Sequence, residues 1–505
     1  MEFHGCYFHG HDCHLTKAHN GFNSKVGKSF QTLSEETQER TAYLKSFGYT
    51  VVEMRECEWY HMKRQNPNIQ LYLDTIFPPR KDFFGHGAPY SEEELLKAVI
   101  EKDLFGLVLC DVNVPEEHRE KFSEMTPVFK NVNVSREDIG VFMQEYTQDH
   151  NLLKQPRRTL IGSYFGKQIL LTTPLLKWYV AHGLSVSNVT EVIEYRPRAC
   201  FERFADTVSN NRRAGDLDPK KGILAETFKV LGNSAYGKTL EDVGRHRSIV
   251  YVEGSKAGKL INNPLFRKCT SLSDELIEVE SVKREVLWNL PLQIGFFVYQ
   301  YAKLKMLQFH YDFLDRFISR ADYQLCEMDT DSLYMALSAD SLEKLVSPHD
   351  RKIFFEEYPK WFPTPACEKH LEDFKQAHIF NREWVPCTCC MSEAKFQKRT
   401  PGLFKEEWSG DGIVALCSKT YYCFSGDGGK DKFSCKGLNK HTNTITKDMY
   451  LNVLASRTSG GGLNRGFRVV REGVYTYEQQ RQSLSYLYIK RKVSKDDVST
   501  EPLDI

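Results

Sequence analysis

The order of apolar and polar residues predicts both helices and strands along the chain. Residues 32–49 (TLSEETQERTAYLKSFGY) have the pattern of a surface helix, and residues 50–59 (TVVEMRECEW) have that of a strand. A continuous apolar run at 104–112 (LFGLVLCDV) is typical of a buried strand and ends at an acid. Two helices joined by the turn AGDLDPKKG are predicted between 199 and 240, and a long helix between 291 and 314. This pattern predicts a chain of mixed helix and strand type.

The stretch YQLCEMDTDSLYMAL, residues 323–337, is predicted to form two short strands around an acidic turn. Asp329 and Asp331 flank Thr330 at its tip. Because apolar neighbours indicate buried strands, two carboxylates at this position are costly unless a cation compensates them. Hard oxygen ligands on a rigid turn suit Mg²⁺, which also binds substrate phosphates. The alternative interpretation is a solvated turn without a ligand.

A second polar pattern lies in FKVLGNSAYGKTLED, residues 228–242. Lys229, Asn233 and Tyr236 are spaced to share about one face of a helix, and Gly237 permits close backbone approach. Such a face can neutralise a triphosphate with the lysine and press the tyrosine ring against a base pair. The alternative is a polar helix face that ends in a glycine cap.

These two stretches resemble motifs B and C of family B DNA polymerases, in the same order along the chain. LCSKTYYCF supports the resemblance, because Lys419, Thr420 and Tyr421 are similar to the K-x-Y motif that grips the primer strand in that family. KFSCKGLNK follows, with Lys436, as in the protein-primed branch. The resemblance covers roughly residues 104–505.

The resemblance implies an α/β and α+β multidomain protein with a palm, fingers and thumb. The expected division is 104–198 for the N-terminal part of the palm, 199–250 for the fingers, 251–400 for the palm with the metal-binding hairpin, and 401–505 for the primer-gripping segment and thumb. Residues 1–66 would form a separate zinc domain, with 67–103 as a linker that closes in a short acidic helix.

The implied activity is template-directed DNA synthesis by a DNA-directed DNA polymerase of a self-replicating mobile element or viral relic. Asp329 and Asp331 would bind two Mg²⁺ ions, which Mn²⁺ can replace, while Lys229, Asn233 and Tyr236 bind the deoxynucleoside triphosphate. Arg212 or Arg213 would contact its phosphates, unless both belong to a solvated helix end. Lys419, Tyr421 and Lys436 would bind primer-template DNA. A terminal protein is a further expected partner.

One element of the family is not found. Motif A, D-x-x-S-L-Y-P, normally supplies a third acid from a separate palm strand. Asp111, in CDVNVPEE, is the nearest substitute, because it ends a buried strand. In related mobile-element polymerases a similar stretch follows motif A, which counts against Asp111. An inactive DNA-binding remnant is therefore the alternative to a polymerase.

The N-terminal segment has a Cys/His pattern suited to zinc. Cys6, His11, Cys13 and Cys57 give C-x4-H-x-C plus a distant cysteine, a credible Cys3His set. The alternative is four unrelated thiols and imidazoles. Residues 2–59 resemble very-short-patch-repair endonucleases, and His4 and His9 match the catalytic histidines of that family. The family's metal-binding aspartate precedes FHGC, where this chain has no room for it, so the expected domain is N-terminally incomplete. Zinc binding carries over better than nicking, which remains a third hypothesis.

Composition sets the limits on these interpretations. The chain has 505 residues, 41% of them hydrophobic, which predicts a globular protein of several domains. Its 68 basic and 67 acidic residues give a net charge of +1, so nucleic-acid binding must come from local patches. Residues 395–440 are such a patch, with nine basic and five acidic residues.

Cysteine and hydropathy patterns bear on location. Fourteen unevenly spread cysteines favour a reducing compartment, nucleus or cytoplasm, and no apolar stretch predicts a membrane span. Cys387, Cys389 and Cys390 form a further C-x-C-C group, which we interpret as incidental because no histidine lies in register with it.

Overall fold

The chain folds into two compact units, residues 1–83 and 84–505, each of which is described by itself. The computed structural model describes residues 2–66 except 15, 18, 19, 24, 25 and 49, then 69, 83, 84, 91–101, and 104–505 except 274, 366, 381, 383, 427, 471, 472 and 495–498. Most of the predicted linker, 67–103, lies outside the described residues. No helix in the described part of the chain combines the length and apolar character needed to span a bilayer.

The first unit is a small α/β arrangement built on one parallel strand pair. Strand β1 (Glu2–His4) pairs with β4 (Glu53–Arg55), and helix α1 (Phe30–Ser46) connects them after the hairpin of β2 (Phe22–Asn23) and β3 (Lys28–Ser29). Ser29 caps α1, because its side chain accepts a hydrogen bond from the Thr32 N–H. The predicted helix at 32–49 is thereby confirmed.

The strand predicted at 50–59 is wrong over its second half. Only β4 is extended, and helix α2 (Glu56–Gln65) begins directly after it. The Glu58 side chain accepts a hydrogen bond from the Arg55 N–H at 3.0 Å, which favours a helix start at this point. Cys57 therefore lies in the first turn of a helix instead of on a strand.

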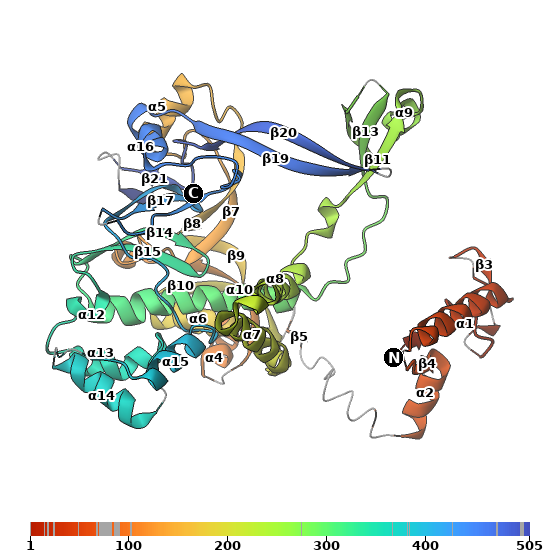
Figure 1. The fold of residues 1–505 in the computed structure, drawn as a ribbon, viewed down its shortest axis with the longest axis horizontal. Helices are drawn as coiled ribbons and strands as arrows, with labels where there is room; N and C mark the ends of the chain where they lie inside the picture. Colours follow the sequence, from red (N-terminus) through yellow and green to blue (C-terminus); the bar gives the residue numbers. More distant parts are fainter. Residues whose placement is uncertain are drawn as a thin grey trace. The chain divides into compact units, whose positions relative to one another are not determined.

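The second unit is built around a sheet with the strand order β5-β10-β6-β9, in which β6 pairs antiparallel with β10 and with β9; β9 and β10 are labelled in Figure 1. Its strands are β5 (Phe83–Phe84), β6 (Gly106–Asn113), β9 (Phe165–Thr172) and β10 (Ser185–Glu194). Strand β6 lies between β10 and β9, and it confirms the predicted strand at 104–112.

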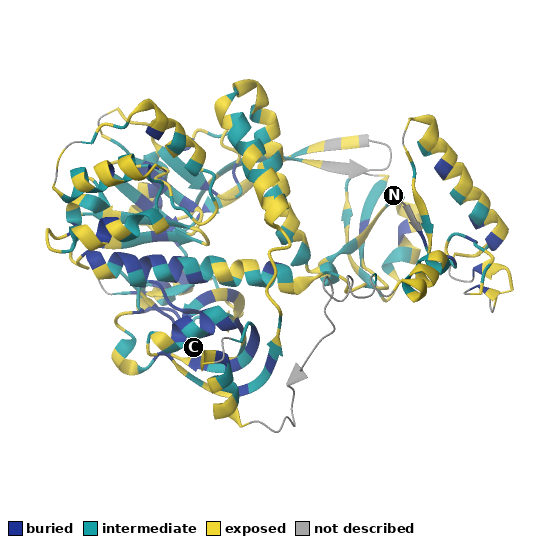
Figure 2. Ribbon diagram, turned by 90° about the horizontal axis from the view of Figure 1, so that it is seen from below, coloured by how far each residue is buried: buried dark blue, intermediate teal, exposed yellow. Residues whose placement is uncertain are grey.

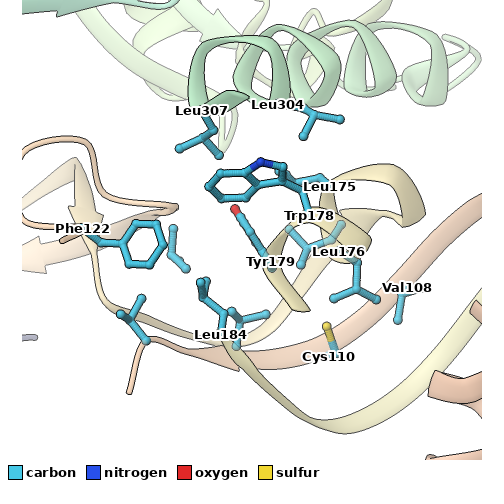
Figure 3. Close-up of a cluster of buried hydrophobic side chains, with 14 of the residues drawn as sticks. Val108, Cys110, Phe122, Leu175, Leu176, Trp178, Tyr179, Leu184, Leu304 and Leu307 are labelled. Atoms are coloured by element: carbon cyan, nitrogen blue, oxygen red, sulfur yellow. The ribbon is translucent and has the colours of Figure 1, made fainter. Parts of the chain in front are cut away.

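Helices α4 (Glu92–Glu101), α6 (Thr173–Ala181) and α10 (Leu292–Leu307) contribute to a hydrophobic core on this sheet. Val108 and Cys110 of β6 point into it, toward Leu176, Trp178 and Tyr179 (Figure 3). Val99 of α4 is fully buried in the same core. The acidic helix at the end of the predicted linker is thus a packed part of this unit.

A helical hairpin carries the predicted nucleotide-binding residues. It consists of α7 (Glu202–Leu217), a short 3₁₀ turn (Pro219–Lys221) and α8 (Gly222–Thr239), as the sequence predicts. After it come a small sheet of β11 (Arg247–Glu253), β13 (Leu276–Val282) and β12 (Phe266–Ser271) with helix α9 (Gly254–Ile261).

Helix α10 continues without a break into a π-helical stretch, η5 (Gln308–Leu314), and then α11 (Asp315–Phe317). Buried positions are dense in the second half of this rod, from Leu304 onward, and sparse in the first half (Figure 2). Leu304 and Leu307 pack in the core on the sheet, whereas Phe309 and Phe313 pack in another core. That second core includes side chains of α13 (Arg351–Glu357) and α14 (Glu368–Ile379). One continuous helix therefore connects two separate cores.

The predicted acidic hairpin follows this rod. Strands β14 (Tyr323–Asp329) and β15 (Ser332–Leu337) pair antiparallel, with Asp329 opposite Ser332. Helices α12 (Leu342–Leu345), α13, α14 and α15 (Thr388–Gln397) come next in the chain.

The C-terminal part begins with a sheet of β16 (Gly412–Cys417), β17 (Thr420–Phe424) and β18 (Lys432–Cys435). It continues with α16 (Lys447–Ser456) and the long hairpin of β19 (Gly460–Val470) and β20 (Gly473–Leu484). The chain ends in the pair β21 (Arg491–Val493) and β22 (Thr500–Pro502).

A third core joins this C-terminal part to an earlier segment of the unit. That segment contains β7 (Val128–Val134), α5 (Val141–Asp149) and β8 (Arg157–Ser163). Tyr450 of α16 is fully buried in this core together with Val134 of β7.

Candidate functional site

The acidic turn is held between the core and a second, polar surface. Met328 and Leu333 pack against the core on the central sheet. Because side chains alternate along a strand, Glu327 and Asp329 point to the opposite face of the hairpin. Thr330 takes a left-handed conformation with φ 46°, which reverses the chain between the two acids. The hairpin therefore presents Asp329 and Asp331 at an exposed tip.

Lys419 lies against this tip, and its contacts fix it there. The residue occupies the tight turn between β16 and β17 with φ 67°. Its Nζ is 3.3 Å from Asp329 Oδ1, and its backbone N–H donates to Glu327 Oε1 at 3.2 Å. Ser434 Oγ donates to the Lys419 carbonyl at 2.9 Å. The structure thus brings together the predicted catalytic acid Asp329 and the predicted primer-gripping lysine, which are far apart in the sequence.

Burial, together with the charge of Asp329, favours protonation of two carboxyls at the turn. Burial raises the pKa of Glu327, which is 7% exposed, although the Lys419 N–H acts in the opposite direction. Neighbouring protein atoms and the negative charge of Asp329 also raise the pKa of Asp331, even though that residue is exposed on the turn. A cation placed at the tip would relieve the repulsion between the two aspartates.

Tyr421 of β17 also meets the hairpin. Its hydroxyl lies 2.9 Å from that of Tyr334 on β15, and the two rings are 4.7 Å apart. Lys432 Nζ lies over the Tyr334 ring and pairs with Glu407 at 3.0 Å. Lys436, which follows β18, is exposed. Of the predicted primer-binding residues, Lys419 and Tyr421 thus contact the hairpin, and Lys436 follows the strand that pairs with β17.

Helix α8 approaches the turn from another direction. The charge of Asp331 contributes to a raised pKa of Tyr236, after the larger effects of burial and of Tyr299. The ring of Tyr236 packs edge-to-face on Tyr299 of α10, with 5.9 Å between centroids. Lys229 and Asn233 are exposed on the same helix, and Lys229 pairs with Glu226 one turn earlier at 3.5 Å. Tyr236 is therefore within electrostatic reach of the acidic turn.

The two predicted phosphate-binding arginines have different surroundings. Arg213 is engaged with the end of α15: its Nε donates to the Phe396 carbonyl at 3.1 Å, and its guanidinium lies 3.7 Å from the centre of the Phe396 ring. Arg212 is half-buried, and burial together with the positive charge of Arg399 lowers its pKa. Arg213 is therefore held by Phe396 of α15, whereas Arg212 makes no such contact with Phe396.

The structure does not bring Asp111 to the acidic turn. Its neighbours in sequence, Cys110 and Val112, point into the core that contains Met328, so Asp111 points to the other face of the sheet. Its Oδ1 accepts from the Gln168 N–H at 2.6 Å, and its Oδ2 accepts from Asn188 Nδ2 at 3.3 Å. The Gln168 N–H is the main cause of a lowered pKa of Asp111. The carboxylate thus connects β6 to Gln168 of β9 and Asn188 of β10, at the positions where the pairing with these strands is irregular.

In the first unit, Cys6, His11, Cys13 and Cys57 converge as the sequence predicts. Their ligand atoms all lie within 4.8 Å of one another. His11 Nδ1 is 3.5 Å from Cys6 Sγ and 3.4 Å from Cys57 Sγ. Cys57 lies in the first turn of α2, directly after β4. Because β4 pairs with β1, this turn lies beside the segment that follows β1 and carries the other three residues. This set can hold a metal ion such as zinc.

His4 and His9 lie beside this cluster. Their rings are 4.6 Å apart, and with Glu53 they line a cavity of about 320 Å³. Glu53 Oε1 is 3.2 Å from His4 Nε2 and accepts from Thr41 Oγ1 at 2.7 Å. Glu53 was not singled out from the sequence, and its place beside β1 follows only from the strand pairing.

The interpretation of Cys387, Cys389 and Cys390 as incidental is wrong. His370 Nδ1 lies 3.3 Å from Cys389 Sγ, and the four ligand atoms fall within 4.8 Å of one another. His370 was missed because it is 17 residues before Cys387, at the start of a different helix. This second set can also hold a metal ion such as zinc.

Comparison of the chain with models of known protein families, with curated proteins and with solved structures gives no match.

Proposed function

We propose that residues 84–505 bind primer-template DNA and transfer nucleotides at the turn that carries Asp329 and Asp331. The observation that carries this proposal is the meeting of the acidic turn with Lys419, Nζ to Oδ1 at 3.3 Å, and with Tyr236 of α8 within its electrostatic reach. These three segments are the ones that resemble polymerase motifs. They are separated by about ninety residues each in the sequence, so a fold is required to unite them.

The donor set of the turn suits a hard divalent cation. Asp329 and Asp331 supply carboxylate oxygens at an exposed tip, and the ammonium of Lys419 already lies against one of them. Mg²⁺ or Mn²⁺ held there would supply charge neutralisation for the triphosphate and would acidify the primer hydroxyl.

The chain's own residues would perform the remaining tasks. Lys229 and Asn233, exposed on one face of α8, bind the triphosphate, and Tyr236 supports the nascent base pair. Arg212 contributes a further positive charge from α7. Lys419 and Tyr421 hold the primer strand close to the acids, and the exposed Lys436 contacts the DNA backbone. Positioning and charge stabilisation of this kind are the main contributions of a protein to phosphoryl transfer.

Among the described residues, no third carboxylate from a separate strand is free to bind a second ion at the turn, and Glu327, on the same hairpin, is buried and accepts the Lys419 N–H. Asp111 faces the opposite side of its sheet, and Glu407 is paired with Lys405 at 3.1 Å and Lys432 at 3.0 Å. This observation favours DNA binding without synthesis as the alternative outcome.

Primer extension by the whole chain, with Mg²⁺ and with Mn²⁺, tests the proposal. The wild type should extend a primer, and Asp331→Asn should abolish extension without loss of duplex binding. Asp340→Asn, which removes one exposed acid just beyond β15, is the matched control and should retain activity. A wild-type chain that binds duplex but never extends it would establish the non-catalytic alternative. Absence of both activities would refute the proposal.

The cavity beside the first zinc cluster favours a second candidate function, nicking of DNA by residues 1–66. His4, His9 and Glu53 meet there, a combination suited to acid–base chemistry on a phosphodiester. Incubation with supercoiled plasmid should yield nicked circles, and His9→Ala should prevent this. His14→Ala, at an exposed position, is the control. Equal nicking by the wild type and His9→Ala would exclude this function.

A further inference from the structure

The first turns of α14 and α15 form a compact group of one imidazole and three thiols. Cys387 is the residue that precedes α15, Cys389 and Cys390 lie in its first turn, and His370 lies in the first turn of α14. His370 Nδ1 is 3.7 Å from Cys387 Sγ, and the sulfur of Cys387 is 3.4 Å from that of Cys390. The sulfurs of Cys389 and Cys390 are 4.0 Å apart.

Two of the three sulfur–sulfur distances, 3.4 and 4.0 Å, are close to those of a tetrahedral metal site, and the third, between Cys387 and Cys389, is shorter at 2.8 Å. Zn–S bonds of about 2.3 Å in a tetrahedron place two sulfurs about 3.8 Å apart. The Cys390 N–H points at Cys387 Sγ, with 3.5 Å between nitrogen and sulfur, which would stabilise a metal-bound thiolate. A disulfide fits less well, because the nearest sulfurs, those of Cys387 and Cys389, are 2.8 Å apart, longer than an S–S bond of about 2.05 Å, and only Thr388 lies between the two residues.

Helix α15 has little apolar anchorage along its length. Of its ten residues, Cys390 is the buried one, while Met391 and Phe396 are 48% and 50% exposed. A surface helix of this length normally buries an apolar face against a core. The cluster therefore contains the residue that α15 buries, and a metal ion would supply the anchorage that an apolar face does not.

The opposite end of α15 supports α7. The Phe396 carbonyl accepts a hydrogen bond from Arg213, whose guanidinium packs on the Phe396 ring. Arg399 forms a bidentate salt bridge with Asp216 of α7. A fixed α15 is thus a brace between α14 and the helical hairpin of α7 and α8.

We propose that His370, Cys387, Cys389 and Cys390 bind one structural Zn²⁺ ion that fixes α15 on α14 and so braces α7. Four protein ligands close the coordination sphere, which is typical of a structural site and leaves no position for a substrate. The site is separate from the cluster at Cys6, and it does not depend on the proposed DNA synthesis.

Metal analysis of the purified whole chain provides the first test. The wild type should contain two zinc ions per chain, and Cys389→Ser and Cys57→Ser should each contain one. Cys367→Ser, an exposed thiol directly before α14, and Cys269→Ser, an exposed thiol on β12, are matched controls and should retain both ions. One zinc in the wild type that only Cys57→Ser removes would refute the second site. Loss of one ion from Cys367→Ser would refute the ligand set.

Hydrogen exchange tests the bracing role without reference to activity. Cys389→Ser should speed amide exchange in α15 and in α7, and leave exchange in α1 unchanged. The variant Arg399→Gln, which removes the pair with Asp216 and keeps all four ligands, should speed exchange in α7 with two zinc ions still bound. Unchanged exchange in α7 after loss of the ion would show that the metal does not brace this helix.

Discussion

Replacing Gly295 by alanine tests how α8, the helix with Lys229 and Tyr236, is held in place. Gly295 is buried in α10, and its N–H donates to Thr239 Oγ1 at the end of α8 at 3.0 Å. An added Cβ would lie 2.4 Å from Leu240 Cγ and 2.5 Å from Thr239 Oγ1. Both distances are far inside van der Waals contact, so the end of α8 must move away from α10.

The net effect can be worked out from two opposing terms. Overpacking of this kind typically costs about 1–3 kcal/mol, and the upper part of the range applies because two neighbours are overlapped. Alanine instead of glycine inside a helix returns about 1 kcal/mol. The contact should therefore be weakened by about 1–2 kcal/mol, which corresponds to about 5- to 30-fold more frequent opening.

Hydrogen exchange of α8 peptides, followed by mass spectrometry, measures this opening directly. Gly237→Ala, at a glycine of α8 itself, is the matched control, because an added Cβ there meets no atom within 4 Å. Only the helix-propensity term applies to it, so exchange should slow. If Gly295→Ala left α8 exchange as slow as in the wild type, the crossing with α10 would not be what holds this helix.

Three further predictions concern single side chains of the proposed site. Lys419→Ala should reduce the slope of log binding constant against log salt by about 0.9 for duplex DNA, the value of one phosphate contact, and an unchanged slope would exclude Lys419 from the DNA interface. Burial raises the pKa of Glu327 in the folded protein, so the contribution of this carboxyl to stability is full below its ordinary pKa and is lost as pH rises through the pKa of the folded state. Glu327→Gln should therefore flatten the fall of Tm between acidic and neutral pH. A pH profile of Tm equal to that of the wild type would contradict this. The pKa of Asp111 is lowered in the folded protein, so the contribution of this carboxylate to stability is present above its ordinary pKa and is lost on acidification. Asp111→Asn should therefore lower Tm at pH 7 and leave primer extension intact. Loss of extension at an unchanged Tm would restore Asp111 as a catalytic acid.

The sequence predicts local elements well where a periodic pattern is strong. The strand at β6, the helices α7 and α8 and the acidic hairpin all follow from apolar spacing and turn residues. The strand expected through Cys57 fails because the Glu58 side chain caps a helix start, and this capping effect outweighs the β-branched residues that precede it.

Residues brought together over long distances are harder to predict. The cluster of Cys6, His11, Cys13 and Cys57 is recognisable because three of its members are close in sequence, whereas His370 lies at the start of α14, 17 residues before Cys387. The role of Asp111 depends on strand pairing: one residue of alternation decides whether it points toward the hairpin or away from it. Neither fact is encoded in a local pattern.

The uninterrupted rod from Leu292 to Phe317 also constrains how this chain can change in length. Leu304 packs on the central sheet, and Phe313 packs in the neighbouring core, which α13 and α14 help to form. Deleting one residue between them would turn every later side chain by about 100° about the helix axis and carry Phe313 out of its place. Substitutions can be absorbed one side chain at a time, but an insertion or deletion here displaces a whole core at once. We therefore expect homologous chains to keep the number of residues between these two positions even where the residues themselves have been replaced.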